Sequence, residues 1–173
     1  MSILNDLTNR ISKINNLTTT SIQSTDNNHR IVLLGIGNES RGDDGLGPYV
    51  INNINITRDN FMLLNCGEVP ESFTGKIIKF IPSHIILIDV AKMGLAVGAM
   101  RIVECSEIKG LGISTHQLPL NMFTDYLEKE TGADIFLIGV EPKTTGFSMN
   151  ISEKVKFSAD LLIKDLTNLL IQF

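Results

Sequence analysis

The sequence has 173 residues, 43% of them hydrophobic, which is enough to bury the core of one ordinary domain. Its formal net charge is -4. An acidic chain of this size offers no broad basic surface, which argues against nucleic acid as the main partner and is typical of a small enzyme.

Apolar residues recur near the amino terminus at the spacing of one helical face. They are Ile3, Leu4, Leu7, Ile11 and Ile14. This pattern predicts an amphipathic helix, and the polar stretch 18–28 that follows it predicts a linker. We expect residues 1–28 to form an N-terminal helix and linker, and residues 29–173 to form the main α/β domain.

The amino-terminal stretch lacks the basic start and unbroken apolar block of a secretory signal. The strongest apolar runs, such as 85–88, are far shorter than the roughly 20 residues of a membrane-spanning helix. Two cysteines, Cys66 and Cys105, lie far apart without a CxxC partner, which argues against a disulfide framework and a structural zinc site. We therefore expect a cytoplasmic protein without a membrane span, whose cysteines are buried small apolar residues.

Strands and helices are expected to alternate along the main domain. Short apolar runs predict strands over 29–36, 61–66, 85–90, 100–104 and 135–140. Helical patterns cover 46–56, 72–80, 115–130 and the stretch from 152 to the end. This alternation predicts an α/β fold, a three-layer sandwich in which helices flank both faces of a twisted, mostly parallel sheet of about five strands.

Three side chains follow predicted strands and are able to bind a metal or transfer a proton. Asp44 follows the first strand, Asp89 lies at the end of the third, and His116 follows the fourth. In an open parallel sheet, ligands bind outside the carboxyl ends of the strands, so these three are expected to converge. His29 and His84 precede strands and should lie at the opposite edge, so they are assigned no role.

The stretch 35–47, GIGNESRGDDGLG, resembles a dinucleotide-binding turn but does not fit one. Ser40 stands where the fingerprint needs its third glycine, and no GxxxxGKS or GxxxxGKT loop is present. Asp43 and Asp44 would also repel a pyrophosphate at short range. A cation suits this loop better.

Structural roles compete with functional ones for each of these residues. Asp43 or Asp44 could cap the helix that follows, although two adjacent aspartates allow one to cap while the other faces a ligand. Taken alone, Asp89 is equally consistent with a turn or capping role and with a functional one, whereas a solitary histidine such as His116 is more often a surface or capping residue. Gly42, Gly45 and Gly47 are expected to leave space beside the carboxylate.

In combination, two carboxylates and one imidazole make an incomplete ligand set for a borderline divalent ion such as nickel or zinc. The histidine would lie at the start of a helix, whose positive end keeps the ring neutral and able to bind metal. A zinc hydrolase would usually have an HExxH pair, and this sequence has none. This favours an ion that belongs to a substrate.

These residues resemble the hydrogenase maturation endopeptidases, in particular the type that serves hydrogenase-3-like, group 4 enzymes. The family opens with GxGNxLxxDDGxG, matched here by Gly35, Gly37, Asn38, Asp43, Asp44, Gly45 and Gly47. Its aspartate and histidine match Asp89 in ILIDVAKMG and His116 in STHQLPL, and CGEVPESFTGKI (66–77) and GVEPKTTGFSMNISEKV (139–155) also fit. The likeness runs from about residue 30 to the end. Glu39 and Ser40 depart from it, because apolar residues usually stand there.

The resemblance implies an aspartic-type endopeptidase that removes the carboxyl-terminal extension of a nickel-iron hydrogenase large-subunit precursor after nickel insertion. It implies that Asp44, Asp89 and His116 recognise nickel bound to the precursor, and that the two aspartates are the catalytic candidates. Gly37, Asn38, Asp43 and Gly45 would support the loop. The protein would then hold no cofactor tightly, since Ni²⁺ arrives with the substrate.

Two other functions remain open at this point. A non-catalytic nickel-binding chaperone or scaffold would dock on the precursor through the same three residues, although the GVEPKTTGF segment favours the peptidase. An independent zinc hydrolase would instead copurify with a tightly bound metal. The oligomeric state is left open.

Overall fold

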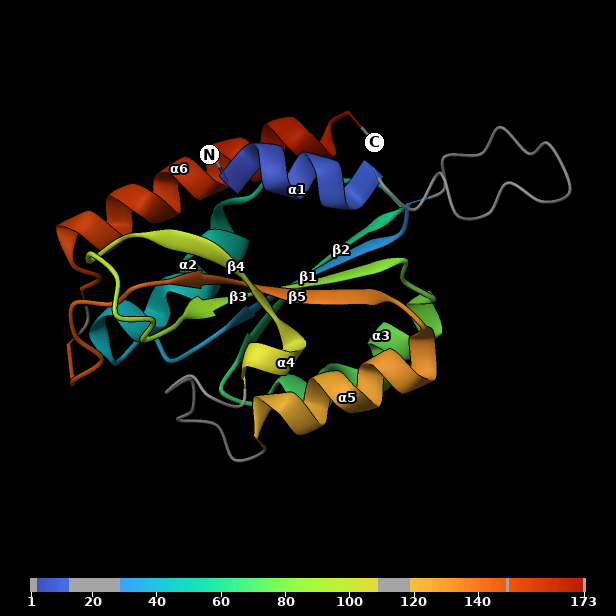
Figure 1. Cartoon of the computed structure of the whole chain (residues 1–173), viewed down its shortest axis with the longest axis horizontal. Helices are drawn as coiled ribbons and strands as arrows, with labels where there is room; N and C mark the ends of the chain where they lie inside the picture. The colour runs from blue at the N-terminus through green and yellow to red at the C-terminus, as the bar shows by residue number, and fades with distance from the viewer. Residues whose placement is uncertain (1–2, 13–28, 109–118, 149, 173) are drawn as a thin grey trace, which may run out of the picture.

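The computed structural model describes residues 3–12, 29–108, 119–148 and 150–172. A five-stranded sheet with helices on both faces forms the molecule (Figure 1). The strands are β1 Ile31–Ile36, β2 Phe61–Gly67, β3 His84–Val90, β4 Met100–Glu104 and β5 Asp134–Val140. Their order across the sheet is β2-β1-β3-β5-β4, and only β4 pairs antiparallel. The predicted α/β sandwich is confirmed.

The helices divide between the two faces of the sheet. They are α1 Ile3–Ser12, α2 Leu46–Asn53, α3 Thr74–Phe80, α4 Cys105–Ile108, α5 Leu120–Thr131 and α6 Glu153–Leu170, with 3-10 turns η2 Gly42–Gly45 and η3 Pro70–Phe73. One face is covered by α1, α2 and α6, and the other by α3, α4 and α5 (Figure 1). Within the described ranges, no helix is long and apolar enough to cross a lipid bilayer.

The central strands are apolar along their whole length because both of their faces are covered. All residues of β1 and β3 are buried. Successive side chains alternate between two cores: Ile31 and Leu33 pack under α2 and α6, whereas Val32 and Leu34 pack over α3 and α5. Parallel pairing brings the carboxyl ends of β1, β2, β3 and β5 to one edge of the sheet.

The direction of β4 differs from the assumption used to place His116. Met100 pairs with Val140 and Glu104 with Phe136, so the carboxyl end of β4 lies at the opposite edge from those of β1 and β3. The connection 91–99 explains this, because it is shorter than the roughly twelve residues that a parallel crossover needs. The expectation that a residue after β4 reaches the same edge as those after β1 and β3 was therefore wrong. The position of His116 itself stays a prediction.

Two predicted helices are shorter in the structure. The helix expected over 46–56 ends at Asn53, and Ile54 already has extended backbone. The helix expected from residue 115 begins at Leu120, directly after Pro119, whose backbone is also extended. Proline disfavours a helical conformation in the residue before it, which is consistent with a start at this point. Residues 109–118 lie outside the described residues.

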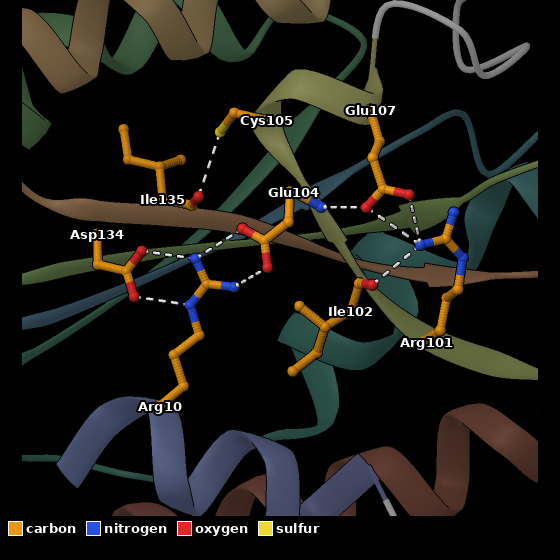
Figure 2. Close-up of polar contacts among 8 residues, drawn as sticks. All are labelled: Arg10, Arg101, Ile102, Glu104, Cys105, Glu107, Asp134 and Ile135. Atoms are coloured by element: carbon orange, nitrogen blue, oxygen red, sulfur yellow. Dashed lines mark hydrogen bonds and ion pairs between the residues drawn. The ribbon is translucent and has the colours of Figure 1, made fainter. Parts of the chain in front are cut away.

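The amino-terminal helix α1 packs on the main domain. Leu7 and Ile11 are fully buried in the core that α6 also lines. Arg10 reaches from α1 to two acids: its Nε and Nη2 donate to Asp134 at 2.7 and 2.6 Å, and its Nη1 donates to Glu104 at 2.6 Å (Figure 2). The guanidinium carbon also lies 4.2 Å from the centroid of the Phe136 ring. Helix α1 therefore shares the core of the domain, whereas the predicted linker 18–28 lies outside the described residues.

Two histidines lie at the amino-terminal edge of the sheet, as expected from their positions before strands. His84 is fully buried and pairs with Ile31 and Asp134 in the ladder. Its ring centroid lies 5.7 Å from that of His29. Burial lowers the pKa of His84 to about 4 and also lowers the pKa of His29. Both rings are therefore neutral at physiological pH, far from the edge that carries Asp44 and Asp89.

We predict that Arg10→Ala lowers the free energy of unfolding by about 2 kcal/mol, because two hydrogen-bonded acids and a cation–π contact lose their partner. Arg101→Ala is the matched control. Arg101 pairs with Glu107 at 3.0 Å on the surface, and its loss should cost less than about 1 kcal/mol. Urea denaturation of both variants measures the difference. Equal losses of unfolding free energy in the two variants would contradict the larger contribution expected from the Arg10 contacts.

We also predict that His84 makes the fold sensitive to mild acid. The unfolded chain protonates His84 near its ordinary pKa of about 6.5, but the folded chain does so only near 4. Stability therefore falls as the pH drops through this window, by about 2 kcal/mol between pH 7.5 and pH 5 for this residue. His84→Asn, which cannot titrate, should show a correspondingly smaller loss in chemical denaturation at the two pH values. Identical losses in both proteins would contradict the assignment.

Candidate functional site

The loop that follows β1 approaches two other parts of the chain at Gly37. This residue has φ of 133°, and its N–H donates to the Gly67 carbonyl at 2.9 Å. A Cβ at this position would overlap the Asp44 carbonyl oxygen and would lie 3.6 Å from Oδ1 of Asp89. Glycine is therefore required both by the backbone angle and by the space.

The side chains of Asp44 and Asp89 lie against the two residues that follow β1, Asp44 at Asn38 and Asp89 at Gly37. Oδ2 of Asp44 accepts a hydrogen bond from the Asn38 N–H at 3.1 Å, and Oδ1 of Asp89 lies beside Gly37. Oδ1 of Asp89 also accepts from the Val90 N–H at 2.7 Å. Both residues are almost completely buried. Two carboxylates this well shielded from water favour a cationic or hydrogen-bonding partner at this edge.

Asp43 points away from this pair and holds the loop after β5. Its Oδ2 accepts from the N–H groups of Lys143 and Thr144 at 2.7 and 2.9 Å, and its Oδ1 accepts from the N–H of Ser152 at 2.6 Å. Ser152 is the N-cap residue, directly before α6. The carboxylate is fully buried. The two adjacent aspartates thus have different surroundings, and among the described residues no side chain caps α2.

Gly35 and Gly47 allow α2 to lie directly on the sheet. A Cβ on Gly47 would overlap main-chain atoms of Ile36 and the carbonyl oxygen of Ile88, and a Cβ on Gly35 would overlap the Gly47 carbonyl. Gly47 therefore serves close helix-to-sheet packing, in place of the expected space beside the carboxylate. This contact fixes where η2, and hence Asp43 and Asp44, lie relative to β1 and β3.

Glu141 is a further acid at this edge that the sequence reasoning missed. It directly follows β5 and is almost completely buried. Its Oε2 accepts from the N–H groups of Met93 and Leu95 at 2.7 and 3.1 Å, which braces the loop after Asp89. The same rule that singled out Asp44 and Asp89, an acid at the end of a strand, would have found it.

The structure describes two of the three predicted metal ligands, Asp44 and Asp89. His116 lies outside the described residues. Among the residues that the structure does describe, no group of three or more His, Cys, Asp or Glu side chains could hold a metal ion. The convergence of His116 with Asp44 and Asp89 therefore stays a prediction.

Neither cysteine is suited to act as a nucleophile. Burial raises the pKa of the Cys66 thiol to about 12 and also raises the pKa of Cys105. Both are free cysteines, and both thiols stay protonated near neutral pH, where only the thiolate would be reactive.

Comparisons with known proteins identify a family for this chain. Residues 49–169 match the family model described as hydrogenase maturation protease, a range that contains Asp89 and begins just after Asp44. The hydrogenase 3 maturation protease of Escherichia coli K12 is 31% identical over 137 residues, which cover 78% of this chain and 87% of that protein.

Solved structures show the same likeness. The crystal structure of a NiFe hydrogenase maturation protease from Thermococcus kodakarensis superposes with a TM-score of 0.76 at 38% identity, and covers 82% of this chain and 92% of that one. A crystal structure of the hydrogenase 3 maturation protease gives 0.72 at 27% identity, with 82% and 91% covered. The family match spans well over half of the sequence and the fold agrees, so the chain belongs to the hydrogenase maturation protease family.

Proposed function

We propose that this protein is an endopeptidase that removes the carboxyl-terminal extension of a nickel-iron hydrogenase large-subunit precursor once nickel has been inserted. The observation that carries the proposal is the buried pair Asp44 and Asp89, whose side chains lie against the adjacent residues Asn38 and Gly37 at the carboxyl edge of a parallel sheet. Family membership supports proteolysis in hydrogenase maturation. The carboxylate pair supports a cationic feature of the substrate as the recognised group.

Nickel is part of the substrate in this proposal. The precursor holds the ion with its own ligands, and Asp44, Asp89 and His116 occupy the positions that remain. Carboxylate oxygen and neutral imidazole nitrogen are suitable donors for such an ion. Without nickel, the two carboxylates have no shared cation on the precursor, so the tail is poorly held. In this proposal, only a precursor that already holds nickel is therefore bound well enough to be cleaved.

Cleavage itself needs one proton carrier beside the scissile bond. One of the two aspartates takes a proton from a water molecule as the water oxygen bonds to the peptide carbonyl carbon. The same group then returns the proton to the leaving nitrogen as the C–N bond breaks. The products are the mature carboxyl terminus and a free tail peptide.

We expect mass loss only from a nickel-loaded precursor. Purified protein is incubated with nickel-loaded and nickel-free precursor, and intact mass is measured over time. The loaded sample should lose a tail-sized mass, because only there does a cation join the two proteins. Equal processing of both samples would reject recognition of nickel. Stable binding without processing of either would instead support the scaffold.

We expect Asp89→Asn to reduce cleavage at least 100-fold while the fold is retained. Asparagine keeps an acceptor for the Val90 N–H but removes the negative charge that binds a cation or accepts a proton. Asp160→Asn is the matched control, because Asp160 is an exposed acid on α6 paired with Lys156 at 2.9 Å. Cleavage rate and thermal unfolding are measured for both. An active Asp89→Asn protein would remove Asp89 from the site.

A further inference from the structure

Exposed apolar side chains lie on three loops at the edge that carries Asp44 and Asp89. Val69 follows β2, Leu95 follows β3 and Phe147 follows β5. Phe147 is the most exposed of them, at 91%. Each loop also contacts the parts that form the site: the Gly67 carbonyl accepts from the N–H of Gly37, the Leu95 N–H donates to Glu141, and the Ser148 N–H donates to Ser40. We call Val69, Leu95 and Phe147 the apolar rim.

The loop that carries Phe147 is fixed on both sides of this residue. Before it, the N–H groups of Lys143 and Thr144 donate to Asp43, and Nε of Arg41 donates to the Thr145 carbonyl at 3.3 Å. After it, the Ser148 carbonyl accepts from the Gly42 N–H at 2.7 Å, and the Ser148 N–H donates to the Ser40 carbonyl at 3.1 Å. The backbone on both sides of Phe147 is therefore held by hydrogen bonds within the chain itself.

A loop that is already held by hydrogen bonds lowers the free-energy cost of binding through an exposed aromatic ring. Binding normally costs free energy for ordering loops and side chains at the interface, and a loop that is already held loses less. Large aromatic residues also contribute most of the binding energy in many protein interfaces. Phe147 combines both features on a loop that is held by Asp43, the chain neighbour of Asp44.

We propose that Phe147 is the anchor with which this protein docks on its substrate, by entering an apolar pocket on the folded precursor next to the metal and the tail. This rests on the proposed function, which it deepens by naming a specificity residue. The partner surface is then a cation bordered by apolar groups, which meets the carboxylate pair bordered by the apolar rim. Val69 and Leu95 contact the same surface from the loops after β2 and β3.

The test compares four proteins: wild type, Phe147→Ala, Phe147→Leu and Ile81→Ala. Ile81 is the matched control, because it is 73% exposed and lies in the turn between α3 and β3, at the opposite edge. We measure the Kd for nickel-loaded precursor by calorimetry, and KM and kcat for its cleavage. Thermal unfolding and light scattering of each protein record its stability and oligomeric state.

We expect Phe147→Ala to raise Kd and KM at least tenfold and to change kcat less than twofold, because it removes contacts made before the chemical step as well as during it. Phe147→Leu should recover part of the loss, and Ile81→Ala should match wild type. Unchanged Kd and KM in Phe147→Ala would overturn the proposal, as would a loss of affinity explained by unfolding or by a broken dimer of this chain.

Because Kd and cleavage are measured separately, failure of the docking role can be distinguished from failure of the endopeptidase. A wild-type protein that binds the precursor without cleaving it would reject the endopeptidase, and the Kd of Phe147→Ala would still decide the docking role. If wild type cleaves and Phe147→Ala has the same constants, the endopeptidase stands and the docking role falls. Neither binding nor cleavage by wild type would reject both.

Discussion

The carboxylate of Asp43 connects the parts of the chain that make up the site. It accepts hydrogen bonds from the N–H groups of Lys143, Thr144 and Ser152, so one buried side chain links the loop after β1, the loop after β5 and the N-cap residue directly before α6. Charge-assisted hydrogen bonds of this kind are about twice as strong as neutral ones, and a carboxylate buried without them would be very unfavourable. Both loops are therefore held in one arrangement, and everything proposed for this edge depends on it.

Two neighbouring aspartates can serve different purposes because the backbone turns sharply between β1 and α2. Asp43 points toward the loop after β5, whereas Asp44 borders Gly37 and Asn38 beside Asp89. Glycines make this possible in two ways. Gly37 leaves room for the Asp44 main chain and the Asp89 carboxylate, and the contact between α2 and the sheet at Gly47 fixes the start of the helix. The DDG sequence is thus one structural acid followed by one acid at the edge.

Local patterns were enough to predict the strands, the sandwich and the place of Asp89 at the end of β3, because burial on both faces leaves long apolar runs that end where the chain leaves the sheet. Long-range contacts were not predictable in this way. Asp43 binds residues about a hundred positions away, and Arg10 of α1 binds Asp134 and Glu104, neither of which has a local signal. The direction of β4 follows from the short connection 91–99, whose length the predicted strand bounds already contain, so the antiparallel pairing was predictable although the residue pattern of the strand itself does not show it. The position of His116 stays a prediction.

In the proposed complex, the carboxylate pair and the apolar rim contribute differently. Apolar contacts made by Phe147 are the same whether or not the precursor holds nickel, so they raise affinity for both forms equally. Only the interaction with the cation differs between them, and discrimination is a difference of two affinities. Because the rim supplies affinity, the carboxylates need not bind nickel tightly by themselves, and a weak, incomplete ligand set is sufficient. Such a set would also be poorly suited to removing nickel from the precursor.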